Sequence, residues 1–529
     1  MSHALTIVAL LAAVVACGTL AKRLNVPYPI VFLLGGIVFA FIPNTPSIKL
    51  DPQTIFLIVL PPLLVYGGWQ TDWFAFKRDI RTITALSIGL VIVTAVIIAL
   101  LAHDAMGLSW PMGFVLGAIV APPDAVAAEA IFERFSVPRR MVAILTGEGL
   151  LNDATALTLY RYALAAAVAG TFSLRAVSLS FLFVTVGGVA IGLLCAVLIE
   201  AALRFLRSQM LDDAMLVTIV LLMAPYVSYL PAEALGASGV LASVAAGIFL
   251  GRRSSSYMNS ESRIVGTAVW DVMVFLLNAF VFLTIGLQMR AVFASLRQPA
   301  AVFLLHSVLV CVTLVAVRFA WVFSSYAFWR QFAWVRAYEP PVSWRERVLV
   351  AYSGMRGIVS LAAALSIPYA TRGGAPLPGR SEIIAITIVV ILVTLVGQGL
   401  TLAPLIEWLG IGEASRMQTR DASVRVKALE AGVKRLHDLE PTFQSATEWE
   451  MAGRLLREYE DRIEHLRGHL ANDPDEGEPT ESSVDHRLQN EALQAERLEI
   501  SRLRAAGEIP DDVYRGIEYD LDLADLRLT

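Results

Sequence analysis

The chain has 529 residues, of which 56% are hydrophobic and only 17% are charged, well below the share of about 25% that is usual in soluble domains. Charge is divided unevenly, because residues 411–529 carry 16 Lys and Arg against 27 Asp and Glu, whereas residues 1–410 carry 26 against 19. The composition therefore excludes a uniformly soluble protein. It predicts a transmembrane domain over residues 1–410, followed by an acidic helical tail over residues 411–529.

Thirteen apolar runs approach the length of about 17–25 residues that crosses a bilayer as a helix. They lie near residues 4–21, 27–43, 53–70, 82–102, 109–132, 140–169, 177–203, 212–230, 236–250, 265–289, 300–328, 347–369 and 383–409. We therefore predict an all-α polytopic membrane protein with about 13 transmembrane helices. Basic residues follow the first run instead of preceding it, so we expect a retained span and not a secretory signal.

The basic residues between the runs favour one orientation. With the N-terminus outside, the cytoplasmic loops carry 17 Lys and Arg and the external loops carry 6, which is the positive-inside pattern. An odd number of spans then places the tail in the cytoplasm. The cytoplasmic group consists of Lys22, Arg23, Lys77, Arg78, Arg81, Arg134, Arg139, Arg140, Arg204, Arg207, Arg252, Arg253, Arg263, Arg330, Arg336, Arg345 and Arg347.

A double proline interrupts the fifth apolar run. Pro123 has no N–H to donate, and its ring disfavours helical geometry at Pro122, so we expect the helix to break here. Asp124 follows directly. Broken backbone at membrane depth is tolerated only where it is buried in protein or lines a cavity.

The sixth run contains the polar residues Glu148, Asn152 and Asp153. Ionisable residues at bilayer depth are costly and usually face an internal cavity. Residues four apart share a helix face, so Gly149 lies beside Asp153 and leaves room for water or an ion. Together with the broken fifth run, this pattern predicts an ion site of the kind found in secondary transporters.

A second interrupted segment lies near the end of the apolar domain, at residues 351–368. Gly354 and Gly357 flank Arg356 within an otherwise apolar sequence. Glycine weakens a helix and permits close backbone approach, and an arginine at this depth needs a partner. Two interrupted segments in separate halves of a chain are typical of inverted-repeat transporters.

With these segments the chain resembles the monovalent cation:proton antiporters, specifically the bacterial sodium/proton exchangers related to NhaP and to the animal exchangers. The matching stretches occur in the family's order: LPPLLVYGGW (60–69), GAIVAPPDAVA (117–127), VPRRMVAILTGEGLLNDATALTLYR (137–161), ASGVLASVAAG (237–247), FLLNAFVFLTIGLQ (275–288) and GMRGIVSLAAAL (354–365). The resemblance implies the sodium/proton antiporter fold, with inverted repeats and two crossed, unwound helices. It also implies a homodimer in the lipid of a bacterial inner membrane, alternating access and a role in pH homeostasis.

The resemblance also implies roles for individual residues. Asp153 is expected to be the shared site for a proton and a monovalent cation (Na+, or Li+ or K+), with Asn152 beside it. Asp124 is expected in the unwound segment, and Glu148 and Arg356 are expected to form a buried structural ion pair. Because burial disfavours the charged form of a carboxylate, Asp153 can hold a proton and exchange it for a cation.

Two departures from the family pattern leave the cation open. The family usually has hydroxyl residues where this chain has Pro123 and Gly149, so the cation ligands are not fully predicted. Asp124 could bind the cation or cap the second half-helix. Asn152 leaves one titrating carboxylate at this position, and the family resemblance, in which an Asp here accompanies electrogenic exchange, implies electroneutral exchange. Asn152 could equally hydrogen-bond a neighbouring backbone group.

Other functions remain as alternatives. A potassium/proton or mixed-cation antiporter is the nearest one, and an ion channel or a membrane sensor acting through the tail are more remote. An enzyme is disfavoured because the sequence has no nucleotide, metal or nucleophile motif. The three cysteines lie inside apolar runs without metal-ligand spacing, and we expect no cofactor and no nucleic-acid partner.

Overall fold

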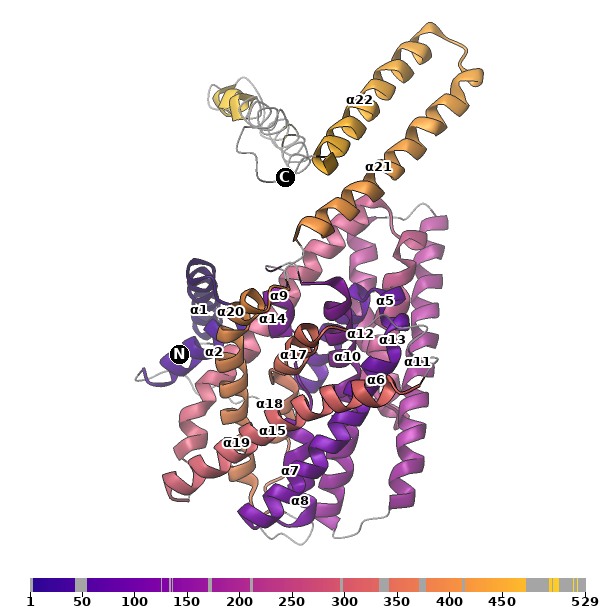
Figure 1. Cartoon of the computed structure of the whole chain (residues 1–529). Coiled ribbons are helices and arrows are strands. Elements are labelled where there is room, and N and C mark those ends of the chain that lie inside the picture. Colours follow the sequence, from indigo (N-terminus) through magenta and orange to yellow (C-terminus); the bar gives the residue numbers. More distant parts are fainter. Residues whose placement is uncertain are drawn as a thin grey trace. The chain divides into compact units, whose positions relative to one another are not determined.

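The computed structural model (Figure 1) divides into two units, Met1–Glu413 and Ala414–Thr529, named here the apolar unit and the tail unit. Every regular element in the described part of the chain is helical. The structure describes residues 3–42, 55–124, 126–132, 135, 137–169, 174–209, 213–294, 298–332, 342–370, 377–411, 414–471, 494–496, 498–503, 517 and 521.

Helices cover the predicted apolar runs, and several extend beyond them. The first half of the apolar unit contains α1 (His3–Leu24), α2 (Tyr28–Ala40), η1 (Ile55–Val59), α4 (Leu60–Gln70), α5 (Trp73–Arg78), α6 (Ile80–Thr84), η2 (Ala85–Leu90), α7 (Val91–Met106), α8 (Trp110–Val120), α9 (Val126–Phe132) and α10 (Arg139–Ala169). The second half contains α11 (Leu174–Ser208), α12 (Ala214–Ala234), α13 (Gly239–Tyr257), α14 (Ser260–Ala294), α15 (Ala300–Trp329), α17 (Trp344–Tyr352), α18 (Ile358–Leu365), α19 (Arg380–Leu392), η3 (Val393–Gln398) and α20 (Gly399–Leu409).

Six stretches of helix in the described residues are long and apolar enough to cross a membrane. Shorter apolar helices add to them, and α10 has the length of a span at 31 residues. The count of thirteen spans stays a prediction. The six are Ile80–Met106, Phe181–Ser208, Ala214–Ala234, Ser260–Ala294, Ala300–Trp329 and Arg380–Leu409.

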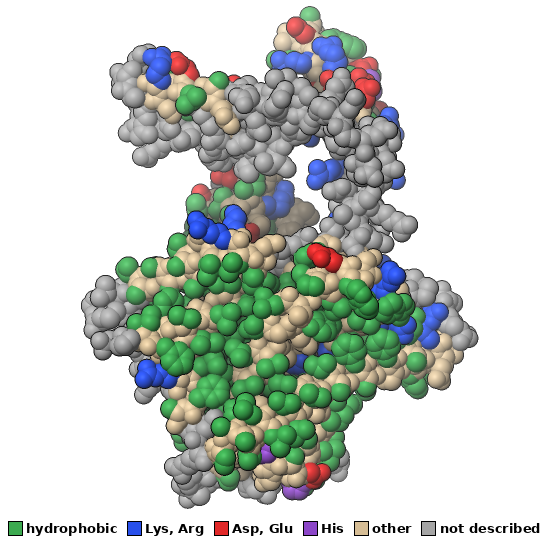
Figure 2. All heavy atoms as spheres, turned by 60° about the vertical axis from the view of Figure 1, so that its left-hand side comes forward, with side chains coloured by type: hydrophobic (Ala, Val, Ile, Leu, Met, Phe, Trp, Pro, Cys, Tyr) green, Lys and Arg blue, Asp and Glu red, His purple; other side chains and the backbone are tan. Residues whose placement is uncertain are grey.

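The exterior of the apolar unit is rich in hydrophobic side chains. Figure 2 shows one face on which they predominate. Exposed apolar surface of this extent marks contact with a membrane or a protein partner. Among the large exposed hydrophobic residues on α11, α12 and α15 are Leu182, Phe183, Leu194, Met215, Ile219, Met223, Leu304, Leu305 and Val312.

Two sets of helices in the apolar unit each pack closely together. One group consists of α4, α11, α12 and α13, with α13 packed against each of the other three. In the other group α8 packs against α7, α10 and α18, while α15 packs against α7, α17 and α19. Most buried hydrophobic residues of α10, α15, α17 and α18 belong to one large hydrophobic core.

Two helices of the second group are interrupted where the sequence predicts breaks. α8 ends at Val120, and residues 121–124 are not helical; α17 ends at Tyr352, and residues 353–357 are not helical. The backbone N–H of Asp124 donates to the carbonyl of Met355 over 2.6 Å. Backbone groups that the helices release at the two breaks therefore bond to each other.

In the tail unit, α21 (Ala414–Leu439) and α22 (Ala446–Ala471) lie side by side as a helical hairpin, with the short helix η4 (Glu440–Thr442) between them (Figure 1). Arg467 of α22 contacts Glu430 of α21 over 2.6 Å. At the start of α22 the Glu448 carboxylate accepts hydrogen bonds from the backbone N–H groups of Gln444 and Ser445. These bonds give a partner to two backbone N–H groups at the start of α22 that would otherwise bond only to water.

Candidate ion-binding site

Four of the predicted site residues line one cavity of ≈ 100 Å³. Asp153 and Gly149 reach it from α10, and Pro123 and Asp124 from the break after α8. Leu60, Leu63, Leu64 and Gly67 of α4 form another wall. A water molecule needs about 10–15 Å³ of such space, so the cavity has room for a few waters or a partly hydrated ion.

The Asp153 side chain is partly exposed to this cavity. Within the described residues it makes no hydrogen bond and no ion pair, and the carboxylate of Asp124 lines the same cavity. Gly149 lies one turn before Asp153 and lines the same cavity. The missing side chain at Gly149 therefore adds to the space in front of the Asp153 carboxylate.

Asn152 faces away from the cavity and is completely buried, with 0% of its surface exposed. Its Nδ2 donates to the carbonyl oxygen of Pro123 over 2.7 Å, which ties α10 to the break after α8. Its Oδ1 has no hydrogen-bond partner in the described part of the chain. Of the two roles considered for Asn152, the structure contains the hydrogen bond to a backbone group.

Asp124 approaches the second break closely because residue 357 is glycine. A Cβ atom at Gly357 would lie 1.6 Å from Oδ2 of Asp124, far inside van der Waals contact. Any side chain at this position would displace the carboxylate or the backbone. Gly357 thus permits Asp124 to lie between the two interrupted helices.

The predicted ion pair between Glu148 and Arg356 is wrong. Glu148 binds Arg318 of α15 in a bidentate pair, with Nη1 2.5 Å from Oε1 and Nη2 2.8 Å from Oε2. Both side chains are buried, with 1% and 2% exposed. Gly354 makes room for this arginine, since a Cβ there would lie 2.5 Å from Cδ of Arg318.

Arg356 instead donates hydrogen bonds to backbone carbonyls at the two helix breaks. Its Nε donates over 3.0 Å to the carbonyl of Val120, the last residue of α8, and its Nη1 donates to the carbonyl of Gly354. A cation at the carboxyl end of a helix is favourable because the free carbonyls there carry partial negative charge. Arg356 therefore compensates the interruption of α8 directly.

Ser360 and Glu129 also line the cavity, although sequence patterns alone do not single them out. Ser360 lies on α18, is only 2% exposed, and its Oγ has no hydrogen-bond partner in the described residues. Thr146 of α10 donates to the carboxylate of Glu129 on α9. The one sequence feature that could have indicated Ser360 as a site residue is its position in the segment GMRGIVSLAAAL, shortly after the second break.

An apolar exterior around interrupted helices and buried carboxylates defines a membrane protein of the secondary-transporter class. The model of the family described as "Sodium/hydrogen exchanger, transmembrane" matches residues 8–408. The chain belongs to this family of transmembrane sodium/hydrogen exchangers. It is a family of antiporters and not of enzymes.

Individual relatives agree with this assignment. The chain is 30% identical to a protein of Escherichia coli described as the uncharacterized Na+/H+ exchanger YjcE, over 95% of this chain and 94% of that protein. It is 28% identical to a protein of Bacillus subtilis described as a sodium, potassium, lithium and rubidium/H+ antiporter, over 96% and 75% of the two chains. The solved structure of the sodium proton antiporter MjNhaP1 from Methanocaldococcus jannaschii matches with a TM-score of 0.59 and 20% identity, over 78% of this chain and 100% of that one.

Proposed function

We propose that the chain exchanges a monovalent cation for a proton, and that Asp153 binds either one in turn. The observation that carries this proposal is a carboxylate that faces a ≈ 100 Å³ cavity without a hydrogen-bond or ion-pair partner in the described residues, in a member of the sodium/hydrogen exchanger family. A buried charge without compensation is unfavourable. We therefore expect the site to switch from facing one side of the membrane to facing the other only when Asp153 carries H+ or a cation.

Oxygen atoms around the cavity fit a hard monovalent cation, which prefers oxygen ligands. The carboxylates of Asp153 and Asp124 supply charge, and the unpartnered hydroxyl of Ser360 supplies a neutral ligand. Water fills the remaining positions. Ser360 thus replaces one of the hydroxyl groups that are missing at Pro123 and Gly149.

Electroneutral exchange follows from the residue next to Asp153. Asn152 is neutral and is held by its bond to the Pro123 carbonyl, so Asp153 is the titrating group of this pair. One proton bound at Asp153 then balances one monovalent cation.

Alternating access is the mechanism we propose for this site. The bond between Asp124 and Met355 and the bond between Arg356 and Val120 link the two breaks, which supports their assignment as a crossed, unwound pair. The bond between Asn152 and the Pro123 carbonyl ties α10 to the first break, so we expect the breaks and α10 to move together. Movement of this group against α4, the opposite wall of the cavity, would open Asp153 to one side of the membrane and then to the other.

The remaining features of the arrangement are also proposals. Residues 1–410 would form thirteen spans with inverted repeats and carry out transport, with the N-terminus outside the bacterial inner membrane. Residues 411–529 would form a cytoplasmic tail. A homodimer of such chains would serve pH homeostasis. The apolar surfaces of α11 and α12 provide area for lipid or for a second copy.

A mixed-cation antiporter is the second candidate. The Bacillus subtilis relative is described as acting on sodium, potassium, lithium and rubidium. The present cavity has few neutral oxygen ligands to impose a fixed geometry. Both features favour weak discrimination among alkali cations.

Proteoliposomes containing the full chain provide the test. Proton flux driven by Na+, Li+ or K+ gradients should be present in the wild type and fall to the level of empty liposomes in Asp153→Asn. Competition for one site predicts that the half-saturating cation concentration rises as pH falls, by up to about tenfold per pH unit. Folded Asp153→Asn protein that still exchanges cations for protons, or a cation affinity independent of pH, would refute the proposal.

A further inference from the structure

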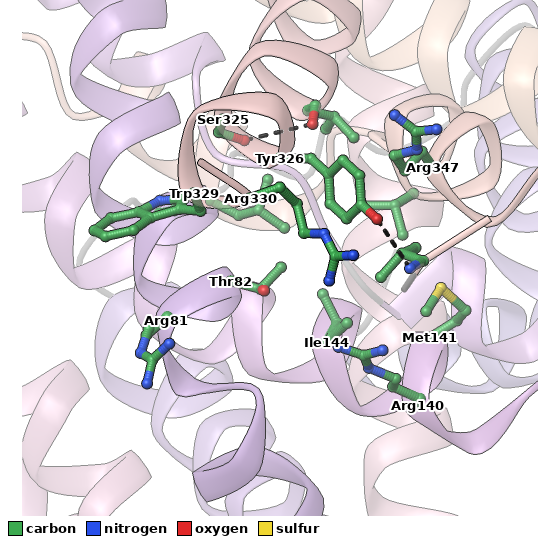
Figure 3. A pocket seen from close by; sticks show the side chains of 15 residues that line it. Arg81, Thr82, Arg140, Met141, Ile144, Ser325, Tyr326, Trp329, Arg330 and Arg347 are labelled. Carbon is green, nitrogen blue, oxygen red and sulfur yellow. Dashed lines mark hydrogen bonds between the residues drawn. The ribbon is translucent and has the colours of Figure 1, made fainter. Parts of the chain in front are cut away.

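One end of α10, the helix that carries Asp153, lies among arginines from other elements. Arg140 in its first turn lines a pocket of ≈ 70 Å³ together with Arg81, Arg330 and Arg347 (Figure 3). All four belong to the group of basic residues that the sequence assigns to the cytoplasmic side. Basic residues gather on that side of a membrane, so we expect this end of α10 to face the cytoplasm.

The ion-site cavity extends from Asp153 toward this same end of α10. Its α10 wall consists of Thr146, Gly149, Leu150 and Asp153, which share one face of the helix and span about 10 Å along its axis. One turn beyond Asp153 on that face, Leu157 is buried in the hydrophobic core. The cavity therefore lies on the cytoplasmic side of Asp153, as in an inward-facing transporter.

Toward the opposite end of α10, an ion pair joins this helix to α12. Nη2 of Arg161 donates over 2.8 Å to Oε2 and over 3.0 Å to Oε1 of Glu233. Arg161 lies about 12 Å along the helix axis beyond Asp153. The Arg161 side chain is 51% exposed and that of Glu233 is 28% exposed, so the pair lies at the surface of the apolar unit and not in its core.

Glu233 is itself fixed by α13. Its Oε1 accepts a hydrogen bond over 3.1 Å from the backbone N–H of Gly239, the first residue of α13. A carboxylate at the start of a helix is favoured by the free N–H groups there. A Cβ at residue 239 would lie 2.9 Å from Cγ of Glu233, so glycine permits this approach. The pair therefore connects α10 to the set of helices formed by α4, α11, α12 and α13.

We propose that Arg161 and Glu233 are positioning residues that hold α10 against α12 and α13 and so keep the ion site closed on the external side while it faces the cytoplasm. This inference rests on the alternating-access mechanism proposed above. In that mechanism α10 moves against the set that contains α4, so the pair breaks as the site turns outward. A partly exposed ion pair contributes little stability, and it therefore breaks readily in each cycle while biasing the two states several-fold.

Thiol labelling of whole cells tests this closure without depending on ion exchange. Leu157→Cys places a thiol on the face of α10 one turn beyond Asp153, and a membrane-impermeant maleimide is added outside. We expect Arg161→Gln or Glu233→Gln to raise the labelling rate about threefold. The double variant should label no faster than either single variant, because both changes remove the same contact.

Two controls accompany this measurement. Arg204→Gln removes an arginine that is also 51% exposed, but its partner Glu200 lies in the same helix, α11. Labelling should not change in this variant. The chain without an introduced cysteine gives the background, since its own cysteines, Cys17, Cys195 and Cys311, are buried.

A reversible cross-link tests the consequence for transport. In Arg161→Cys/Glu233→Cys, a bifunctional methanethiosulfonate should stop Na+-driven proton flux in proteoliposomes, and dithiothreitol should restore it. The single-cysteine variants should stay active with the reagent. In Asp153→Asn the flux is lost, but Arg161→Gln should still accelerate labelling at residue 157, so failure of the ion site and failure of this contact give different results. Unchanged labelling in both single variants, a double variant that labels faster than either, or flux that persists after cross-linking would overturn the proposal.

Discussion

Glu148 and Asp153 are both acidic residues of α10, separated by five positions, and their surroundings are opposite. Glu148 is bound to Arg318 through both carboxylate oxygens, whereas Asp153 faces the cavity shared with Asp124. Five residues at 3.6 per turn place the two side chains about 140° apart around the helix axis. One therefore points toward α15 and the other toward the breaks. Compensation of charge therefore distinguishes Glu148 from Asp153, the residue proposed to carry the transported ion.

The largest effect is expected from removing the partner of the compensated carboxylate. Arg318→Gln leaves Glu148 as an unpaired buried charge and should lower the free energy of unfolding by about 3–5 kcal/mol. Thermal unfolding of the purified protein in detergent measures this loss. Asp153→Asn should unfold near the wild-type temperature, because it removes a charge that has no partner. Equal stability of Arg318→Gln and wild type would contradict the structural role.

The second effect concerns the close approach of the two breaks. Gly357→Ala places a methyl group against the Asp124 carboxylate, and a displacement of about 1 Å can reduce activity about 100-fold. Cation-driven proton flux in proteoliposomes should fall accordingly. Gly397→Ala is the matched control, because a Cβ there would meet no atom within 4 Å. Similar flux in both variants would argue against a packed junction.

A smaller effect is expected from the cavity hydroxyl. Ser360→Ala removes a neutral ligand but no charge, so the half-saturating cation concentration should rise several-fold while the maximal rate changes little. Ser366→Ala provides a comparison, since Ser366 contacts Tyr160 through its hydroxyl and does not line the cavity. If both substitutions left cation affinity unchanged, Ser360 would not be a ligand.

The smallest effect concerns a carboxylate that faces water. Hydrogen bonds from the backbone of Gln444 and Ser445 hold the pKa of Glu448 below its ordinary value of 4.5. Its stabilisation of the first turn of α22 is therefore present above pH 4.5 and is lost as pH falls through the lowered pKa. Hydrogen exchange in the full chain should show faster exchange of residues 444–449 in Glu448→Gln at neutral pH. Cation-driven flux should not change.

Much of the site could be predicted from the local sequence. Prolines 122 and 123 stop a helix by covalent geometry, and the spacing of Gly149 and Asp153 assigns them to one helix face. Both expectations agree with the cavity that the structure contains. Ser360 escaped prediction because a serine in an apolar helix usually bonds to its own backbone, and only the three-dimensional arrangement leaves its hydroxyl without a partner.

The sequence by itself determined the elements that depend on a residue and its neighbours along the chain: the apolar helices, the breaks and the acidic groups at membrane depth. Tertiary structure alone decided which charges meet. Arg318 and Arg356 both occur in apolar segments of the second half, and Glu148 could have paired with either. The choice of Arg318 depends on how α15 packs against α10 and on the space beside Gly354, which are distances between segments that no local pattern encodes.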